Sequence, residues 1–252
     1  MTLTHKTILI TGASRGIGRA TALHLAKEGA NIVALARTAQ SLNTLCDEIK
    51  SMGGQACAVT GSVDQYEDLV RAADLALSHF GSLDILVNNA GIIDPIARLE
   101  DSAPADWARA VDINVKGVYY GLRAVLPHMM SRGQGTIINL SSGAANSALE
   151  GWSHYCTTKA AVKKITECAH VELGASGIRV IGLSPGTVAT DMMASIRKSG
   201  LNPVSQLDWN THITPDWVAR AIAYLCGPGG DAHCGTDFSI KTDEGRRAVG
   251  LL

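Results

Sequence analysis

The sequence predicts an α/β fold in which seven parallel strands form one doubly wound sheet with helices on both faces. Three observations lead to this prediction. Short apolar runs rich in β-branched residues recur along the 252 residues, longer helical patterns separate them, and a glycine-rich segment follows the first run. Strands that are apolar on both faces need helices over both faces, and such sheets bind ligands at the carboxyl ends of their strands.

The alternation of strands and helices continues to the end of the chain. The expected strands cover residues 7–10, 31–36, 55–59, 83–87, 136–140 and 179–183, with a seventh near 236–240. Helical patterns are clearest over residues 19–28, 104–130 and 152–173. Because no Pro/Gly/Ser linker, charge block or internal repeat interrupts the pattern, we expect a single domain covering residues 1–252.

The composition excludes several classes of function. With 22 basic and 23 acidic residues the chain has no basic field for a nucleic acid. No stretch approaches the ~18 apolar residues of a membrane span, and the first residues lack an export signal, so we expect a cytoplasmic protein without a membrane partner. The six cysteines show neither C-x-x-C nor zinc spacing, which predicts reduced, mostly buried thiols and no metal site.

A nucleotide-binding loop is predicted between the first strand and its helix. Residues 11–18 are Thr-Gly-Ala-Ser-Arg-Gly-Ile-Gly. Glycines let the backbone approach a pyrophosphate, and the helix that follows offers free N–H groups to its negative charge. Glycine-rich turns also occur for purely conformational reasons, but the position between strand and helix favours binding. The expected contacts are Gly12, Ser14, Arg15, Gly16, Ile17 and Gly18.

A possible acid/base pair lies on the expected helix 152–173. Tyr155 and Lys159 are four residues apart, so both side chains leave the same helix face. A nearby ammonium favours the phenolate and lowers the tyrosine pKa. Such a pair also arises by chance in helices, and it gains weight only beside the other motifs. His154 has a different offset, and we expect it on the surface.

These motifs together resemble the short-chain dehydrogenase/reductase family, in its ordinary single-domain branch, over nearly the whole chain. The loop spacing is G-x-x-x-G-x-G rather than G-x-G-x-x-G. Further matches in family order are Asn88-Asn89-Ala90-Gly91, Asn114, Ser142, Tyr155 with Lys159, and Pro185-Gly186 with Thr190. The resemblance implies a Rossmann-type fold and hydride transfer between a nicotinamide cofactor and a ketone or secondary alcohol.

The same resemblance assigns roles to four residues. Tyr155 would exchange a proton with the substrate oxygen, and Lys159 would bind the nicotinamide ribose and, with the oxidised ring, lower the tyrosine pKa. Ser142 would hydrogen-bond the substrate oxygen. The family's serine lies thirteen residues before the tyrosine, a spacing that Ser142 has and Ser141 does not. Asn114 would interrupt the helix 104–130 and hold a water that leads protons to the lysine.

The end of the second strand predicts the cofactor. An acid there would bind both ribose hydroxyls of NAD, but the sequence is Ala36-Arg37-Thr38. Arg37, with Arg15, can instead form a clamp for the 2′-phosphate of NADP, so we expect NADP(H) to be preferred, with NAD(H) possible. The alternative for Arg15 is a local cap or ion pair. Other cofactor contacts implied by the resemblance are Thr38, Ser62 (in place of the usual Asp), Val63, Asn89, Ala90, Gly91, Pro185, Gly186, Val188 and Thr190.

The substrate is expected under a mobile lid formed by residues 192–213. The predicted pocket residues are Ser142, Ala144, Leu149, Trp152, Tyr155, Thr187, Met192 and Met193. Most are apolar and no arginine clamp is evident, which favours a neutral or weakly polar ketone. Two alternatives stay open: reduction of a 3-oxoacyl thioester, and a redox-sensing module that binds the nucleotide without catalysis.

The carboxyl end departs from the family pattern. Members usually have Val-Asp-Gly-Gly after the last strand, whereas this chain has Ile-Lys-Thr-Asp-Glu-Gly at 240–245 and then a basic, apolar tail, 246–252. The resemblance implies a homotetramer, with a homodimer as the alternative. We expect the tail to pack at a subunit interface.

Overall fold

Seven parallel strands form one sheet in the computed structural model of the chain, which describes residues 3–252. The strand order is β3-β2-β1-β4-β5-β6-β7, and every neighbouring pair is parallel. The predicted fold class is therefore confirmed. The strands are β1 (Thr7–Thr11), β2 (Asn31–Ala36), β3 (Gln55–Thr60), β4 (Ile85–Asn88), β5 (Gly135–Leu140), β6 (Ile178–Ser184) and β7 (Asp237–Ser239).

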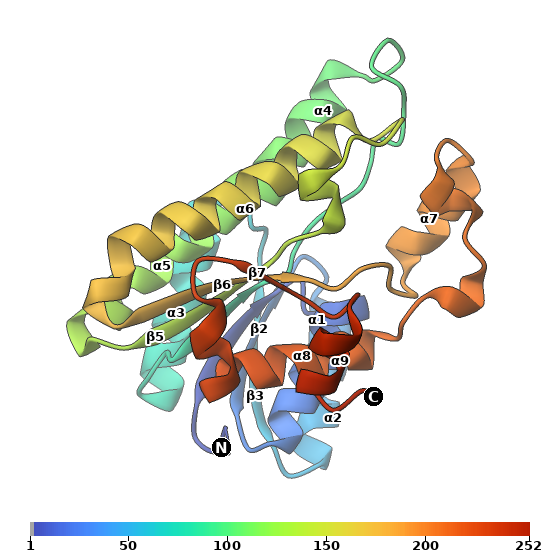
Figure 1. Cartoon of the computed structure of the whole chain (residues 1–252). Helices are drawn as coiled ribbons and strands as arrows, with labels where there is room; N and C mark the ends of the chain where they lie inside the picture. The colour runs from blue at the N-terminus through green and yellow to red at the C-terminus, as the bar shows by residue number, and fades with distance from the viewer. Residues whose placement is uncertain (1–2) are drawn as a thin grey trace.

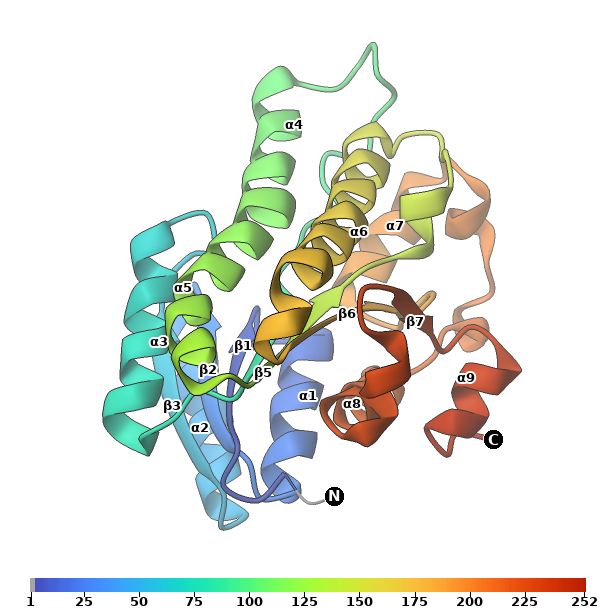
Figure 2. The same cartoon turned by 60° about the vertical axis from the view of Figure 1, so that its left-hand side comes forward.

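Helices cover both faces of the sheet (Figures 1 and 2). One face carries α1 (Gly16–Lys27), α2 (Ala39–Ser51) and α8 (Pro215–Cys226). The other carries α3 (Tyr66–Phe80), α5 (Gly117–Arg132) and α6 (Ser153–Leu173). The shorter helices are α4 (Pro104–Val111), α7 (Asp191–Ser199) and α9 (Asp243–Ala248), and 3₁₀ turns span Gly143–Asn146, Gly174–Ser176, Pro203–Gln206, Trp209–Thr211 and Pro228–His233.

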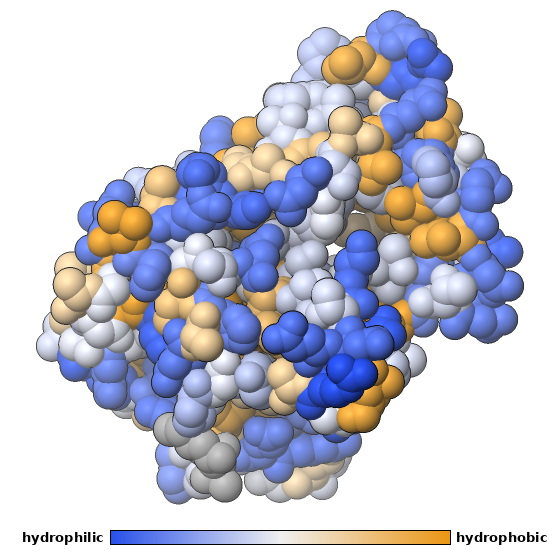
Figure 3. All heavy atoms as spheres, viewed as in Figure 1, coloured by the Kyte–Doolittle hydropathy of each residue, from blue (hydrophilic) through white to orange (hydrophobic). Residues whose placement is uncertain are grey.

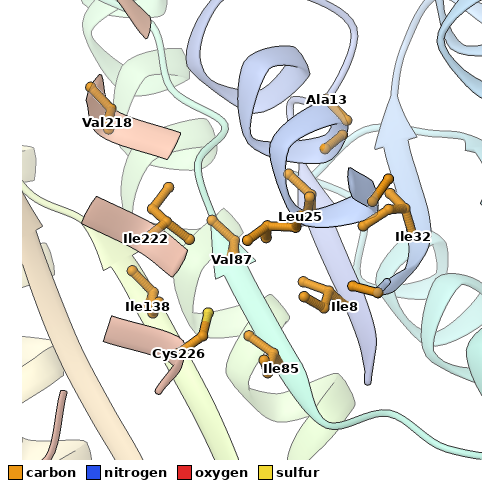
Figure 4. Close-up of a cluster of buried hydrophobic side chains, with 14 of the residues drawn as sticks. Ile8, Ala13, Leu25, Ile32, Ile85, Val87, Ile138, Val218, Ile222 and Cys226 are labelled. Atoms are coloured by element: carbon orange, nitrogen blue, oxygen red, sulfur yellow. The ribbon is translucent and has the colours of Figure 1, made fainter. Parts of the chain in front are cut away.

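The sheet is buried between two apolar layers. In β1, Ile8 faces the α1 and α8 layer while its neighbour Leu9 faces the α3, α5 and α6 layer. Figure 4 shows how Ile8 meets Leu25 of α1 and lies near Ile85 of β4. Burial on both faces explains why the strands read as continuous apolar runs.

Polar side chains interrupt the buried sheet where its strands end. Asn88 and Asn139 are buried, and Asn88 Nδ2 donates to Asn139 Oδ1 over 2.9 Å. Asn139 Nδ2 in turn donates to Thr166 Oγ1 of α6, also over 2.9 Å. These bonds satisfy amides that burial would otherwise make costly. They fix the carboxyl ends of β4 and β5 against α6.

The predicted helix 104–130 is interrupted near its middle. A π-helical turn, Asp112–Lys116, separates α4 from α5, and Asn114 lies within it. In Figure 2 the three pieces form one long rod that rises beyond the sheet. Such turns are rare and are frequent at functional sites.

The segment expected to form a lid, 192–213, contains most of α7 and two 3₁₀ turns. Its return to the sheet is held by Ala189 N, which donates to Ile213 O over 2.9 Å, and by Ile213 N, which donates to Thr187 O over 3.1 Å. Its outer end is tied down by Asn202, whose Nδ2 donates to Glu150 O over 3.0 Å. Figure 1 shows α7 standing apart from the other helices.

The tail that follows β7 forms α9 and packs against α8 of its own chain. Arg246 Nε donates to Ile240 O over 3.0 Å, and its guanidinium lies 5.6 Å from the centre of the Trp217 ring. Arg220 of α8 donates to Gly250 O over 2.7 Å. The expected role of the tail at a subunit interface stays a prediction.

Candidate active site

The glycine loop forms the floor of a cleft of roughly 720 Å³ at the carboxyl ends of β1 and β2. Gly12 and Gly16 have positive φ angles of 66° and 54°, which other residues rarely adopt. At Gly18 a Cβ atom would lie 2.3 Å from Gly12 O, so only glycine fits there. The α1 helix begins at Gly16 and directs its free N–H groups toward the loop.

Most of the predicted cofactor residues line this cleft. They are Gly12, Ser14, Arg15, Gly16, Ile17, Arg37, Thr38, Ser62, Val63, Asn89, Ala90, Gly91 and Thr190. The cleft also takes in Ile92, Ile113, Asp191 and Met192. Gly18, Pro185, Gly186, Val188 and the Ser142, Tyr155 and Lys159 group lie outside its lining. Gly18 serves instead as the close-packing residue of the loop.

The Asn88–Gly91 segment braces the glycine loop. Asn89 Nδ2 donates to Thr11 O over 2.9 Å and to Gly12 O over 3.2 Å. Thr11 Oγ1 accepts from the backbone N–H groups of Asn89 and Ala90, over 3.0 and 3.1 Å. The shape of the glycine-loop backbone is therefore fixed by bonds from the segment after β4.

The two arginines of the expected phosphate clamp differ in their partners. Arg15 Nη1 lies 2.9 Å from Asp191 Oδ2 at the start of α7, in an exposed ion pair with a residue 176 positions away, and it makes no local cap. Arg37 is exposed and has no ion pair among residues 3–252. Asp191 is the one acid among the residues lining the cleft, and it is not at the end of β2. Arg37 is thus the cation available to a phosphate there.

Ser62 lies in the cleft lining after β3, but its backbone is used locally. Its N–H donates to Asp68 Oδ2 over 2.7 Å, and Asp68 also binds Arg71 Nη1 over 2.7 Å. The Ser62 side chain has no hydrogen bond within residues 3–252 and remains available to a ligand.

Tyr155 lies in the first turn of α6, beside Ser142. The Ser142 hydroxyl is near enough to act on the pKa of Tyr155, and Ser142 Oγ accepts from Ala144 N over 3.2 Å. Burial raises the pKa of Tyr155 to about 12, although the Ser142 bond opposes this. The sequence-based expectation of a lowered tyrosine pKa is therefore not met within this chain alone, because desolvation of the phenolate outweighs the effect of Ser142.

Lys159 lies one helical turn beyond Tyr155 on the same face. Its Nζ lies 5.7 Å from the centre of the Tyr155 ring and donates to Leu140 O over 2.6 Å. Burial lowers the pKa of Lys159 to about 8, and the Asp237 carboxylate acts in the opposite direction. The lysine is therefore a cation at neutral pH that titrates within reach of ordinary assays.

Asn114 faces the same region from the π-helical turn. Its Oδ1 accepts from Ile92 N over 2.8 Å, and its Nδ2 donates to Ile92 O over 2.9 Å and to Thr158 Oγ1 over 3.1 Å. A Cβ at Gly91 would lie 3.3 Å from Asn114 Oδ1 and 4.0 Å from Lys159 Nζ. The asparagine side chain thus fixes the segment after β4 against α6; the water relay stays a prediction.

His154 is fully buried, so its predicted surface position is wrong. Its Nε2 lies 2.6 Å from Ile93 O, because the segment after β4 covers the first turn of α6. Burial lowers the pKa of His154, which keeps the ring neutral near pH 7. The histidine holds that segment through Ile93 O.

The predicted substrate pocket is largely an apolar cluster. Ile93, Ala144, Trp152, Tyr155, Met193 and Ile196 are buried together, with Leu149 and Met192 at their edge. Thr187 differs, because its Oγ1 bonds His212 Nδ1 over 2.9 Å. In Figure 3 a hollow separates the α7 segment from the body of the molecule, with hydrophobic residues along its rim.

The structure adds two charged residues that sequence reasoning did not place in the site. Asp237 of β7 accepts from Ser141 Oγ over 2.6 Å. The Lys241 side chain crosses Gly186, and its Nζ lies 3.8 Å from the position of a Cβ at Gly143, next to Ser142. The departure from Val-Asp-Gly-Gly was the sequence signal for Lys241; nothing in the pattern indicated Asp237.

Other expected features concern metals, membranes and cysteines. Residues 3–252 hold no group of three or more His, Cys, Asp or Glu side chains placed to bind a metal ion. None of the helices described there has the length and hydropathy needed to cross a bilayer. All six cysteines are free thiols; Cys46 and Cys226 are buried, whereas Cys168 is exposed.

Known proteins resemble this chain over nearly its full length. A family profile described as "short chain dehydrogenase" matches residues 6–200. Cyclohexanol dehydrogenase of Acinetobacter sp. (strain SE19) is 30% identical, covering 94% of this chain and 93% of its own. The 7alpha-hydroxysteroid dehydrogenase of Escherichia coli (strain K12) is 33% identical over 94% and 92%. A crystal structure of NAD+-bound xylitol dehydrogenase superposes with a TM-score of 0.88 at 27% identity, covering 95% and 99%.

Proposed function

The chain belongs to the short-chain dehydrogenase family, and we propose that it is an NADPH-dependent reductase of ketones that oxidises secondary alcohols in the reverse direction. Membership in the family makes it an oxidoreductase that uses a nicotinamide cofactor. The observation that carries the proposal is the group of Ser142, Tyr155 and Lys159, which unites a proton donor, a hydrogen-bond donor and a buried cation.

The cleft fits a dinucleotide. A Cβ at Gly18 would clash with Gly12 O, and a Cβ at Gly12 would lie 2.9 Å from Ala90 Cα. Both positions therefore require glycine, and without side chains the loop backbone can approach a pyrophosphate closely. The α1 N-terminus would bind the pyrophosphate, and Lys159 the ribose next to the nicotinamide. When bound, the nicotinamide supplies or accepts the hydride.

The residues of the chain handle the proton and the charge on oxygen. Tyr155, which burial keeps protonated at neutral pH, donates its hydroxyl proton to the ketone oxygen as that oxygen becomes negative. Ser142 donates a hydrogen bond to the same oxygen. The Lys159 ammonium stabilises the phenolate that remains. The apolar side chains of the Trp152 and Met193 cluster exclude water from the reacting atoms.

A panel of carbonyl compounds tests this proposal. Cyclohexanone, a ketosteroid and an acetoacetyl thioester would be offered to the protein with NADPH and NADH in parallel, and initial rates measured. Turnover of free ketones above the thioester supports the proposal. Preference for the thioester would support the 3-oxoacyl reductase alternative, and tight NADPH binding without turnover of any compound would support the redox sensor.

Arg37 is expected to determine the preference for NADPH. In Arg37→Gln we expect kcat/KM with NADPH to fall by roughly 30-fold, because a charge-assisted bond to the 2′-phosphate is lost. The value with NADH should change less than about threefold, since NADH has no such phosphate. Arg123→Gln, which alters an exposed arginine of α5 outside the cleft lining, is the matched control. An unchanged NADPH to NADH ratio in Arg37→Gln would reject the assignment.

Lys241 favours a second candidate substrate class, ketones that carry a carboxylate. Its ammonium lies beside Gly143, next to Ser142, and has no ion pair within residues 3–252. In Lys241→Met we expect kcat/KM for a keto acid to fall about tenfold, while that for its methyl ester is unchanged. Lys50→Met, on the exposed side of α2, is the control. Equal effects on acid and ester would exclude this class.

A further inference from the structure

Asp237 occupies a space that the neighbouring strand leaves open for it. It begins β7 and pairs in register with Gly182 of β6. A Cβ at Gly182 would lie 1.8 Å from Asp237 Oδ1, so a side chain there would displace the carboxylate. The glycine thus permits a half-buried acid beside the carboxyl end of β5, where Ser141 begins the segment that carries Ser142.

The carboxylate holds that segment by one short hydrogen bond. Ser141 Oγ donates to Asp237 Oδ2 over 2.6 Å, a length typical of a hydroxyl bound to a charged acceptor. Ser141 N donates to Leu183 O over 2.9 Å, so Ser141 is fixed on both its side chain and its backbone. The other oxygen, Oδ1, is buried and has no hydrogen-bond partner among residues 3–252.

Ser141 joins the two halves of the catalytic group. The residue before it is Leu140, whose carbonyl oxygen accepts from Lys159 Nζ over 2.6 Å. The residue after it is Ser142, whose hydroxyl acts on the pKa of Tyr155. A rotation of the chain at Ser141 would therefore move both contacts at once.

The charges near Asp237 come mainly from α6. Burial raises the pKa of the Asp237 carboxyl, the Ser141 bond and the ammonium groups of Lys163 and Lys159 lower it, and Glu167 raises it. From β5 it faces only the neutral Ser141, and from β6 the bare Gly182. Asp237 is the acid that opposes the effect of burial on Lys159.

We propose that Asp237 is a positioning residue of this active site: its carboxylate fixes the Ser142 segment through Ser141, and, because Lys159 is bound at Leu140 O next to Ser141, its negative charge favours the ammonium form of that lysine. The inference rests on the proposed function of Lys159. The proposed role has two parts, the hydrogen bond to Ser141 and the negative charge near Lys159. One substitution removes the charge and another removes the hydrogen bond.

Asp237→Asn keeps an acceptor for Ser141 but removes the charge. The alkaline limb of the kcat/KM profile for ketone reduction should move to lower pH by about one unit, because the neutral lysine becomes easier to form. Ser141→Ala keeps the charge but removes the bond. It should lower kcat about tenfold and leave the position of the limb unchanged, since general positioning errors of this kind reduce rate rather than pKa. Asp243→Asn, an exposed acid of α9, is the control for both.

The thermal midpoint of Asp237→Asn distinguishes this role from a structural one. Because the pKa of Asp237 is raised in the folded protein, its charged form is less favourable folded than unfolded, and stability is lost as pH rises through that pKa. Removing the charge should leave Tm at pH 7 equal or higher. A fall in Tm with an unmoved alkaline limb would show a purely structural acid and overturn the proposal.

A direct titration of Lys159 keeps the inference separate from the proposed function. In protein labelled with ¹³C at lysine Cε, the Lys159 signal is identified by its absence in Lys159→Met and followed against pH. A midpoint lower in Asp237→Asn than in wild type supports the inference even if no ketone is turned over. Identical midpoints would reject it even in an active enzyme.

Discussion

Replacing Tyr155 by phenylalanine should lower kcat for ketone reduction by about 10³-fold, because a positioned general acid contributes about 10²–10⁴-fold. The hydroxyl is buried next to Ser142 and carries the proton that the ketone oxygen needs. Burial raises its pKa to about 12, so the phenol is protonated and ready to donate across the neutral range. Stopped-flow measurement of NADPH oxidation with the best ketone of the panel would give the rate.

The ring should keep its place when the hydroxyl is removed. It packs edge-on against Trp152 at a centroid distance of 5.5 Å, and phenylalanine preserves that contact. NADPH affinity, measured by protein fluorescence, should therefore change less than about threefold. Tyr119→Phe, which alters an exposed tyrosine of α5, provides a matched control. Residual activity above a tenth of wild type in Tyr155→Phe would remove the tyrosine from its role.

Burial on both faces is what made the fold predictable from the sequence. Each strand forms a separate apolar run, and the runs match the observed strands to within one or two residues. The largest difference is in β4, which begins at Ile85 although the apolar run begins at Leu83. Leu83 is fully buried but precedes the ladder, and hydropathy reports burial rather than strand pairing.

Local spacing also predicted which groups gather in the site. Tyr155 and Lys159 share a helix face because they are one turn apart, whereas Ser142 was assigned to the site by the family resemblance. His154 was misplaced for the opposite reason. Its burial depends on the backbone of Ile93, 61 residues earlier, which no local pattern contains.

The contacts that sequence reasoning missed all span long separations. Arg15 pairs with Asp191 across 176 residues, and Ser141 bonds Asp237 across 96. The first contact joins the glycine loop to the start of α7, and the second joins the end of β5 to β7, which lies on the other side of β6. Only the tertiary fold brings these elements together. Periodicity predicts which face a side chain occupies but not which distant residue comes to meet it.

Replacing Lys159 by methionine should lower kcat/KM for ketone reduction by about 10²–10³-fold, since it removes the cation that stabilises the developing phenolate. The side chain is buried, so methionine fills a similar volume without leaving a charge. Steady-state rates with NADPH would measure the loss. Lys50→Met, which alters an exposed lysine of α2, is the control.

The pH profile assigns the effect to the charge on Lys159. Burial lowers its pKa to about 8, so in wild type the ammonium is lost, and reduction slows, as pH rises through about 8. The Tyr155 pKa of about 12 contributes no limb in that range. In Lys159→Met the rate of ketone reduction should therefore be low and independent of pH from about pH 6 to 9.5. If the rate of this variant still fell near pH 8, the titrating group would be another residue.

The same pKa predicts how the substitution affects stability. The pKa of Lys159 in the folded protein lies below its unfolded value of about 10.4, so burying the protonated lysine costs folding free energy. This cost is fully present below about pH 8 and disappears above the unfolded pKa. Lys159→Met should therefore melt at an equal or higher temperature at pH 7 while losing activity. A variant that lost activity and stability together would indicate that the lysine acts through the fold; stability retained with activity lost places its charge in the reaction.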